Sequence, residues 1–319
     1  MKHPILGLHH VTATVDDARA DLGFYRGVLG LRLVKQTVNF DNHNVYHFYY
    51  GDERGSPGTI WTTFPYKGWG VAPGQHGEGQ ITITSFSVPI GSVAAWRTRL
   101  ANRGLKLRDE TSPFDEESIA FADPSGLTIQ LIASPDSRAP WSGSEVAQEH
   151  AIRGLHSVSL AVAAPAATVA LLTEVLGFQV VDEREKRIRL AVNGNEPGRT
   201  LEIRYGSGGP RGRNGIGTVH HVALAIDGAD EQLRLREELL SRGFGVTEVL
   251  DRQYFQSIYF REPGGVLLEV ATTRPGFTVD EMLKDLGREL KLPPWEEPHR
   301  HAIERGLPPL DGHEIVTHP

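Results

Sequence analysis

The sequence predicts an α+β fold built from four βαβββ modules in two domains. A strand-like segment, a helical segment, a stop glycine and further strand-like segments recur in that order four times along the 319 residues. A segment rich in Ser, Pro, Gly and charge separates the second copy from the third. One such match arises by chance in many α+β proteins, whereas four matches in series indicate an internal repeat.

The first copy begins with a strand over residues 8–15. Asp16 and Asp17 follow it, and we expect them to cap a helix and to place negative charge at its first turn. The helix carries apolar residues at helical spacing and is expected to end at Gly30. Strand-like segments then complete the module at residues 31–38, 45–50 and 59–64.

The three later copies repeat this order at comparable spacing. The second copy has its first strand at 81–88, its helix around 93–100, its stop at Gly104 and its last strands at 119–121 and 127–132. The third has these elements at 155–162, around 168–176, at Gly177, and at 188–192 and 200–205. The fourth has them at 219–226, around 230–241, at Gly243, and near 258–260 and 266–272.

These copies divide the chain into four parts. They predict an N-terminal domain over residues 1–133, a linker over 134–152, a C-terminal domain over 153–273 and a proline-rich tail over 274–319. We expect the tail to pack over the core as irregular structure and short helices.

Composition limits the chemistry and the partners. There is no cysteine, so disulfides, thiolate catalysis and cysteine-based metal sites are excluded, and any metal must be held by His, Asp or Glu. The net charge of −7 argues against nucleic acid as a partner, because phosphate neutralisation needs a basic surface. No apolar stretch approaches the roughly 20 residues that span a bilayer, and the N-terminus lacks a signal-peptide pattern, so a cytoplasmic location is expected.

Paired histidines are the first sign of a site. Copy one carries His9 and His10 in its first strand, and copy four carries His220 and His221 at the equivalent place, where copy three has Ser157. Side chains alternate along a strand, so His10 and His221 are expected on one face, with His9 and His220 on the other face or at its rim.

A carboxylate completes the set. Glu269 lies between Leu268 and Val270 in the last strand of copy four, where a buried carboxylate without a partner is costly and a metal ion would remove that cost. The equivalent residue of copy two is the neutral Gln130. Two imidazoles and one carboxylate, with other positions open, form the ligand set of non-haem Fe(II) enzymes that activate oxygen. The sequence therefore predicts one mononuclear site of His10, His221 and Glu269.

Three further residues are candidates for catalysis. Tyr259 would hydrogen-bond a substrate oxygen or give a proton, with a buried structural tyrosine as the alternative. His9 and His220 would move protons because imidazole titrates near neutral pH, with packed or solvated imidazoles as the alternative. The remaining histidines, His47 among them, are interpreted as ordinary structural or solvated residues.

These residues carry a family resemblance. The four copies are similar to the modules of the vicinal oxygen chelate superfamily, which includes glyoxalase I, fosfomycin-resistance proteins and extradiol dioxygenases. The last strands of copy four, with Tyr259, Glu262, Pro263, Gly265 and Glu269, resemble the C-terminal signature of extradiol enzymes. Hydroquinone and chlorohydroquinone ring-cleaving dioxygenases are most similar, over GLHHVTATVDDARADLGFYRGVLGLRLVKQTVNFD, YHFYYGDERGSPGTIWTTFP and VHHVALAI.

The resemblance implies a fold of cup-shaped mixed sheets, a cofactor and a reaction. Fe(II) would be held by His10, His221 and Glu269, while Mn, Zn and Ni stay open as alternatives. A small aromatic diol and O2 would be the substrates, with Tyr259, His9 and His220 facing the diol. The family's pocket arginine corresponds to Arg252, although the spacing there departs from the family pattern. Whether the chain forms a homo-oligomer is left open.

The resemblance also predicts how the modules pair. Catechol extradiol enzymes take all three ligands from their third and fourth modules, but here Ser157 replaces the required histidine. A complete set therefore requires module one to pair with module four. Modules two and three would then form a second cup without the ligand set.

Two other functions stay open on the same scaffold. A glyoxalase-like lyase or isomerase would use Ni, Zn or Mn and no dioxygen, although such sites commonly add a second carboxylate where Gln130 stands. A non-catalytic binder of aromatic or metal-chelating ligands would show no turnover. Oxygen consumption separates the dioxygenase from both.

Overall fold

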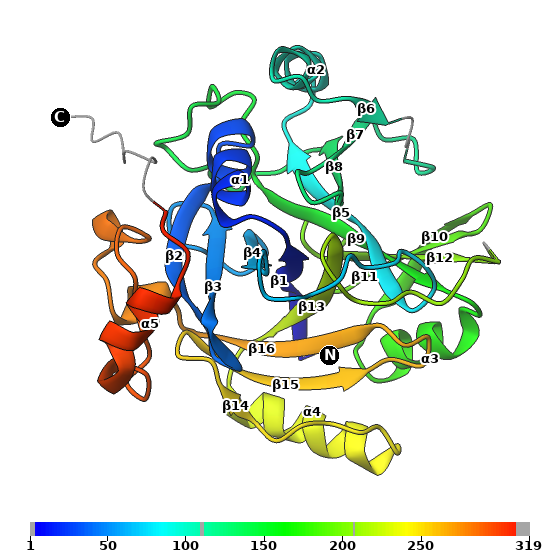
Figure 1. The fold of residues 1–319 in the computed structure, drawn as a ribbon. Helices are drawn as coiled ribbons and strands as arrows, with labels where there is room; N and C mark the ends of the chain where they lie inside the picture. The colour runs from blue at the N-terminus through cyan, green and yellow to red at the C-terminus, as the bar shows by residue number, and fades with distance from the viewer. Residues whose placement is uncertain (1–3, 109–111, 207, 311–319) are drawn as a thin grey trace.

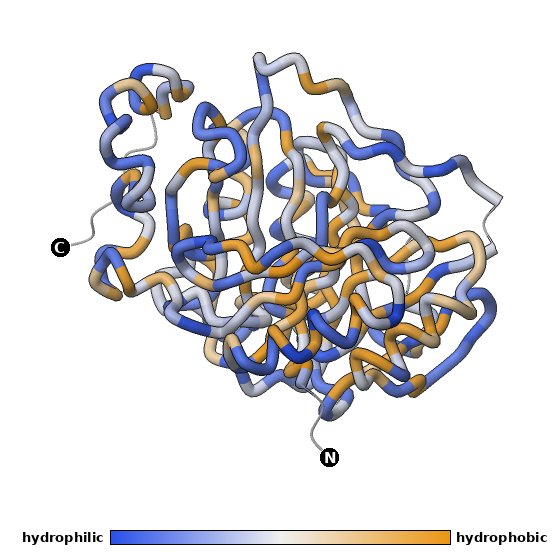
Figure 2. The backbone as a smooth tube through the Cα atoms, turned by 90° about the horizontal axis from the view of Figure 1, so that it is seen from below, coloured by the Kyte–Doolittle hydropathy of each residue, from blue (hydrophilic) through white to orange (hydrophobic). Residues whose placement is uncertain are grey.

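Two eight-stranded sheets make up the described part of the chain in this computed structural model, which covers residues 4–108, 112–206 and 208–310 (Figure 1). Hydrophobic segments gather along the strands in the middle of the molecule, and hydrophilic segments occupy the outer turns (Figure 2). None of the helices in these ranges is long and apolar enough to cross a membrane. The predicted α+β class is confirmed.

The first sheet combines modules one and four. Its strands are β1 (Ile5–Val15), β2 (Arg32–Asn39), β3 (Asn42–Gly51) and β4 (Ile60–Pro65) from module one, and β13 (Thr218–Ile226), β14 (Leu250–Asp251), β15 (Phe255–Arg261) and β16 (Leu267–Pro275) from module four. Their order is β14-β15-β16-β13-β1-β4-β3-β2, with β1 and β13 antiparallel at the centre.

The second sheet combines modules two and three in the same way. Its strands are β5 (Gln80–Val88), β6 (Leu107–Arg108), β7 (Ser118–Ala122), β8 (Thr128–Ala133), β9 (Gly154–Val162), β10 (Gln179–Arg184), β11 (Arg187–Ala191) and β12 (Thr200–Tyr205). Their order is β10-β11-β12-β9-β5-β8-β7-β6, with β5 and β9 antiparallel at the centre.

This topology confirms the predicted pairing of module one with module four and of module two with module three. Each sheet therefore takes strands from both halves of the chain. The division into sequential domains, with a linker at 134–152, is not tested by this arrangement and stays a prediction.

Each module carries one helical segment after its first strand. They are α1 (Ala18–Leu22) with a π-helical turn (Gly23–Val28), α2 (Val93–Asn102), α3 (Ala166–Glu174) and α4 (Ala229–Ser241). The Asp17 carboxylate caps α1 by accepting from the backbone N–H groups of Arg19 and Ala20, as predicted. The four predicted stop glycines all have positive φ, between +70° and +86°, which a residue with a Cβ rarely adopts: Gly30, Gly104, Gly177 and Gly243.

The sequence interpretation missed one strand in each of modules two, three and four. β6 and β14 have two residues each, and β10 is largely exposed along its whole length. Strands this short, or exposed at a sheet edge, have no alternation of buried and exposed residues from which they can be recognised.

The tail packs as irregular structure with short helices, as predicted, within its described part. Its helical turns are Phe277–Val279, Leu283–Asp285, Glu297–His299 and α5 (Arg300–Gly306). Figure 1 shows this segment beside β2 and β3. The fully buried ammonium of Lys35 on β2 pairs with the carboxylates of Asp280 and Glu281, which anchors the start of the tail to the first sheet.

A buried carboxylate joins α1 to the first sheet. Asp21 accepts hydrogen bonds from the hydroxyls of Tyr50 on β3 (2.6 Å) and Thr63 on β4 (2.7 Å). Burial nevertheless raises the pKa of Asp21 to about 7, with a smaller contribution from the charge of Asp123. The second carboxylate oxygen of Asp21 has no hydrogen-bond partner among the described residues.

This raised pKa predicts a pH-dependent stability. Folding favours the protonated acid, so its contribution is fully present below pH 3.8 and is lost as the pH rises through about 7. Between pH 3.8 and about 7, the free energy of unfolding should therefore fall by up to about 1.4 kcal/mol per pH unit because of this group. Asp21→Asn should abolish that part of the pH dependence. Urea unfolding of both proteins at several pH values measures it, and equal slopes would contradict the prediction.

Candidate metal centre

Two β-bulges place the paired histidines. Across β1 and β13, Val11 faces Val222 at the centre of the pair, and the register shifts at His9 on one side and at His220 on the other, with a further shift between Ile5 and Gly7 near the start of β1. The extra residue is His9 on β1 and His220 on β13, so the two strands are related by a local two-fold arrangement. A bulge re-aims neighbouring side chains, and each extra residue lies Nδ1 to Nδ1 against the ligand candidate that follows it, His9 against His10 and His220 against His221.

The three predicted ligands converge. Nε2 of His10 lies 3.3 Å from Nε2 of His221, and Oε2 of Glu269 lies 3.2 Å and 2.8 Å from these two atoms. The three side chains form a buried group whose ligand atoms all lie within 4.8 Å of one another. Metal bonds of about 2.1 Å at right angles separate their donor atoms by about 3 Å, so the triangle fits three adjacent positions on one divalent ion.

Glu269 shows the strongest need for an ion. Its side chain is 0% exposed, and Ser257 donates to Oε1. Oε2 faces the Nε2 atoms of His10 and His221, and when these nitrogens offer their lone pairs to a metal it has no hydrogen-bond donor among the described residues. Burial alone would favour the neutral acid, but the imidazoles of His10 and His221 outweigh it and hold the pKa of Glu269 well below its usual range. A buried anionic oxygen beside two imidazole nitrogens fits a cation.

The neighbouring histidines fix the orientation of the two imidazole ligands. Nδ1 of His10 lies 2.8 Å from Nδ1 of His9, and Nδ1 of His221 lies 2.7 Å from Nδ1 of His220. An imidazole that offers Nε2 to a metal carries its proton on Nδ1, so each ligand would donate to its neighbour. Burial lowers the pKa of both His9 and His220 to about 3, which keeps them neutral and able to accept.

His9 and His220 nevertheless occupy different places. His220 lines the pocket that contains the candidate ligands, beside Tyr259 and Arg252. His9 lines a different pocket and also hydrogen-bonds to the backbone of Thr272. Geometry thus favours contact with a substrate for His220 and a supporting position for His9.

Tyr259 packs against the candidate ligand His221, and Arg252 fixes the position of its phenol hydroxyl. Its ring meets that of His221 at 5.7 Å, and Nε of Arg252 donates to its hydroxyl over 3.2 Å. Arg252 also pairs with both carboxylate oxygens of Asp41. Burial and the charge of Glu269 raise the pKa of Tyr259 well above its ordinary value, so the phenol keeps its proton.

His47 is a pocket residue that the sequence interpretation treated as ordinary. It is buried between the rings of Tyr49 and Phe64, and its Nε2 lies 2.9 Å from the hydroxyl of Thr62. That hydroxyl lies 2.8 Å from the hydroxyl of Thr12, which lines the same pocket. No pairing or spacing marks His47 in the sequence, because it reaches the site from β3 only after the sheet has curled.

These groups surround a pocket of about 230 Å³. Besides the imidazoles, its wall holds polar groups of Thr12, Asn39, Arg252 and Tyr259 and the aromatic ring of Phe64. Apolar walls with a few convergent polar groups are typical of small-molecule sites.

The comparisons with known proteins agree with this architecture. A family model described as the Glyoxalase/Bleomycin resistance protein/Dioxygenase superfamily matches residues 7–131 and 154–270. The chain belongs to this superfamily. The predicted resemblance is thereby confirmed.

Members of the superfamily with named activities are similar over almost the whole chain. A Bacillus subtilis (strain 168) protein named as a candidate ring-cleaving dioxygenase, MhqO, is 40% identical over 316 residues, 99% of this chain and 100% of that protein. The chlorohydroquinone/hydroquinone 1,2-dioxygenase of Sphingobium indicum is 32% identical over 310 residues, 94% of this chain and 95% of that enzyme.

Solved structures of the superfamily show the same fold. A candidate dioxygenase from B. subtilis subsp. subtilis str. 168 has a TM-score of 0.93 at 40% identity, covering 99% of this chain and 100% of that one. Glyoxalase I from Zea mays has a TM-score of 0.63 at 16% identity, covering 89% and 96%, and shows the shared fold alone.

The second cup of this superfamily member offers an internal comparison. Glu202 on β12 faces Ser159, two residues after Ser157, and therefore holds the same register position as Glu269 in module four. The residue that faces it on β11 is Arg189, where module four has Tyr259. Arg189 donates to Glu202 over 2.7 Å, so this carboxylate is neutralised by a guanidinium.

The register confirms that Gln130 is the module-two equivalent of Glu269: it faces Ser85 and Ala120 as Glu269 faces Ala223 and Tyr259. Gln130 belongs to the second sheet, however, and is not part of the site that His10 and His221 line. Within the first sheet, the position equivalent to Glu269 is Thr62, which faces Thr12 two residues after His10. The three predicted ligands therefore lack a second carboxylate at that position.

Glu269 and Glu202 hold equivalent register positions in the two sheets, but only Glu269 is expected to bind a metal ion. Glu269→Gln should weaken binding of one divalent ion per chain by at least the 10- to 100-fold typical of losing a metal-supporting group, because an amide supplies no charge. Titration calorimetry with Mn(II) or Zn(II) measures it. Glu202→Gln is the matched control and should bind as tightly as the wild type, and equal losses in both variants would contradict the assignment.

Proposed function

We propose that this chain is an Fe(II)-dependent ring-cleaving dioxygenase that opens hydroquinone-type or other dihydroxylated aromatic rings with O2. The observation that carries the proposal is the buried triangle of His10, His221 and Glu269, whose ligand atoms all lie within 4.8 Å of one another. Two imidazoles and one carboxylate leave the remaining positions of the ion open, as oxygen-activating Fe(II) sites do. The relatives named as ring-cleaving dioxygenases supply the substrate class.

Bound Fe(II) would supply Lewis acidity and redox capacity at that point. The chain's own residues would do the rest. The protonated phenol of Tyr259, aimed by Arg252, would donate a hydrogen bond to an oxygen of the diol. The imidazole of His220, which lines the same pocket, would move protons at the diol.

The polar groups on the β3 and β4 side would hold the diol in one orientation. Thr12 and His47 both line the pocket and are joined through Thr62. When Nε2 of His47 carries the proton, Thr62 passes on its own hydrogen and Thr12 donates into the pocket. In the opposite tautomer of His47, Thr62 donates to Nε2 of His47 and Thr12 donates to Thr62. Thr12 would then accept a hydrogen bond from a hydroxyl group of the diol. Phe64 and Phe255 line the same pocket and exclude water from the ring's faces.

The alternative glyoxalase-like function finds less support. Thr62, at the position equivalent to Glu269, is a neutral hydroxyl already engaged with His47 and Thr12. A lyase or isomerase that needs a fourth protein ligand as a carboxylate would lack it here.

Oxygen uptake tests the proposal directly. After anaerobic loading with Fe(II), the protein should consume O2 with hydroquinones, and uptake with catechols compares the two diol classes. Protein loaded with Zn(II) is the control and should consume none, because zinc has no redox chemistry. An oxygen electrode measures the rates, and the absence of O2 uptake with every diol tested would rule out the dioxygenase hypothesis.

The two proposed pocket residues have separate expected effects. Tyr259→Phe should lower kcat about 10²- to 10³-fold, as removal of a preorganised donor does. His220→Ala should lower kcat about 10²- to 10⁴-fold, the usual contribution of a proton-transferring side chain. Tyr205→Phe in the second sheet is the control for loss of a phenol hydroxyl. Unchanged turnover in both pocket variants would show that this assignment of roles is wrong.

A further inference from the structure

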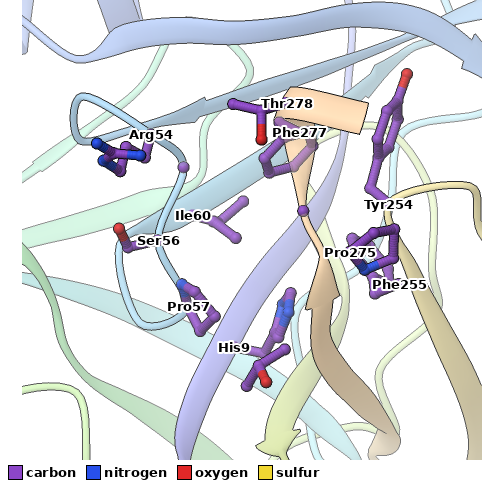
Figure 3. A pocket seen from close by; sticks show the side chains of 13 residues that line it. His9, Arg54, Ser56, Pro57, Ile60, Tyr254, Phe255, Pro275, Phe277 and Thr278 are labelled. Atoms are coloured by element: carbon purple, nitrogen blue, oxygen red, sulfur yellow. The ribbon is translucent and has the colours of Figure 1, made fainter. Parts of the chain in front are cut away.

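A second pocket lies behind the candidate metal centre. It has a volume of about 180 Å³, and its wall combines five apolar side chains with polar groups such as those of Ser56 and Thr273; the apolar residues are Pro57, Ile60, Phe255, Pro275 and Phe277. Figure 3 shows His9 at one end of this rear pocket, with Arg54 and Thr278 at the other. Arg54 and Thr278 are exposed and His9 is buried, so the pocket leads from the surface to His9.

Only one layer of side chains separates the rear pocket from the candidate ligands. Phe255 lines both pockets. His9, at the inner end of the rear pocket, has its ring centre 4.9 Å from that of Phe255 and its Nδ1 2.8 Å from Nδ1 of His10. The ring of Phe255 in turn lies 5.2 Å from that of His10. Small side-chain movements of Phe255 would therefore connect the two spaces.

The rear pocket is built by close packing of two segments. In the loop that follows β3, the carboxylate of Asp52 accepts from the backbone N–H groups of Arg54 and Ser56. Gly55 between them has φ +69°, and a Cβ there would lie 2.6 Å from a ring carbon of Phe277. A glycine at this position therefore lets the loop pack directly against the ring of Phe277 at the start of the tail. The first residues of the tail thus form part of the wall of the rear pocket.

The two pockets differ in the molecules they suit. The front pocket presents hydroxyl, amide, guanidinium and imidazole groups, which match an aromatic diol. The rear pocket presents mainly proline, isoleucine and phenylalanine carbon on the way to His9. Apolar cavities of this kind take up small apolar molecules such as xenon. Dioxygen, the second reactant of the proposed reaction, is such a molecule.

We propose that the rear pocket binds dioxygen and admits it to the first cup past Phe255, by a route separate from that of the diol. The inference rests on the proposed function. A bound ring that fills the front pocket of about 230 Å³ would close the front route, and the rear pocket leaves a second one open. No bond is made or broken in this step, since the gas only moves from one apolar space to another.

Filling the rear pocket tests the route by kinetics. Ser56 is held through its backbone, by Asp52 at its N–H and by Thr59 at its carbonyl, and both contacts survive a change of side chain. Ser56→Phe should raise KM for O2 about tenfold, which corresponds to about 1.4 kcal/mol. KM for the diol and kcat at saturating O2 should stay as in the wild type. Val279→Phe is the matched control, since it adds the same bulk at a half-exposed residue of the neighbouring segment.

Xenon supplies a measurement that needs neither metal nor turnover. Wild-type crystals under xenon pressure should show an atom among Ile60, Phe255 and Phe277, and Ser56→Phe crystals should lose it. An empty rear pocket in the wild type, or an unchanged KM for O2 in a folded and active Ser56→Phe protein, would overturn the route alone. A wild type that consumes no O2 with any diol would overturn the proposed function and the oxygen route with it.

Discussion

The antiparallel pairing of β1 with β13 is the contact on which the candidate centre depends. It joins the first and last modules and brings His10 and His221, 211 residues apart, to 3.3 Å. The bulge on each strand then turns the second imidazole of each pair against the first. Glu269 arrives on β16, the parallel neighbour of β13. The burial of all three ligand candidates follows from this junction.

The two sheets show two solutions to the same electrostatic problem. Glu202 and Glu269 hold equivalent register positions, and both are buried anionic groups. In the second sheet Arg189 neutralises the carboxylate from the facing strand, whereas Tyr259 occupies that place in the first. Tyrosine brings no positive charge, so the first sheet leaves its carboxylate to a cation from outside. Together with Ser157 at the place of His221, the exchange of this facing residue distinguishes the second cup from the candidate metal centre.

The sequence predicted the modules, their pairing and the convergence of three ligands, because paired histidines and stop glycines recur at fixed intervals. It did not predict the bulges, since a shift of one residue leaves no trace in the pattern and only strict alternation can be assumed. Nor did it find His47 or Glu202, which acquire neighbours through the curl of the sheets and have no counterpart motif. The sequence pattern did not predict β10 because this exposed edge strand has no buried face and therefore no alternation of apolar and polar residues. Patterns thus revealed the elements with a buried periodic side, and tertiary contacts decided the rest.

The strands of the second sheet lie between the two halves of the first sheet in the sequence, and this order has a consequence for biosynthesis. The second sheet uses strands between residues 80 and 205, so its partners leave the ribosome close together. The first sheet cannot join its halves until β13 has been made, and Lys35 must wait for residues 280 and 281. Module one therefore spends most of translation without its partner strand, and the site can assemble only after most of the chain has been made.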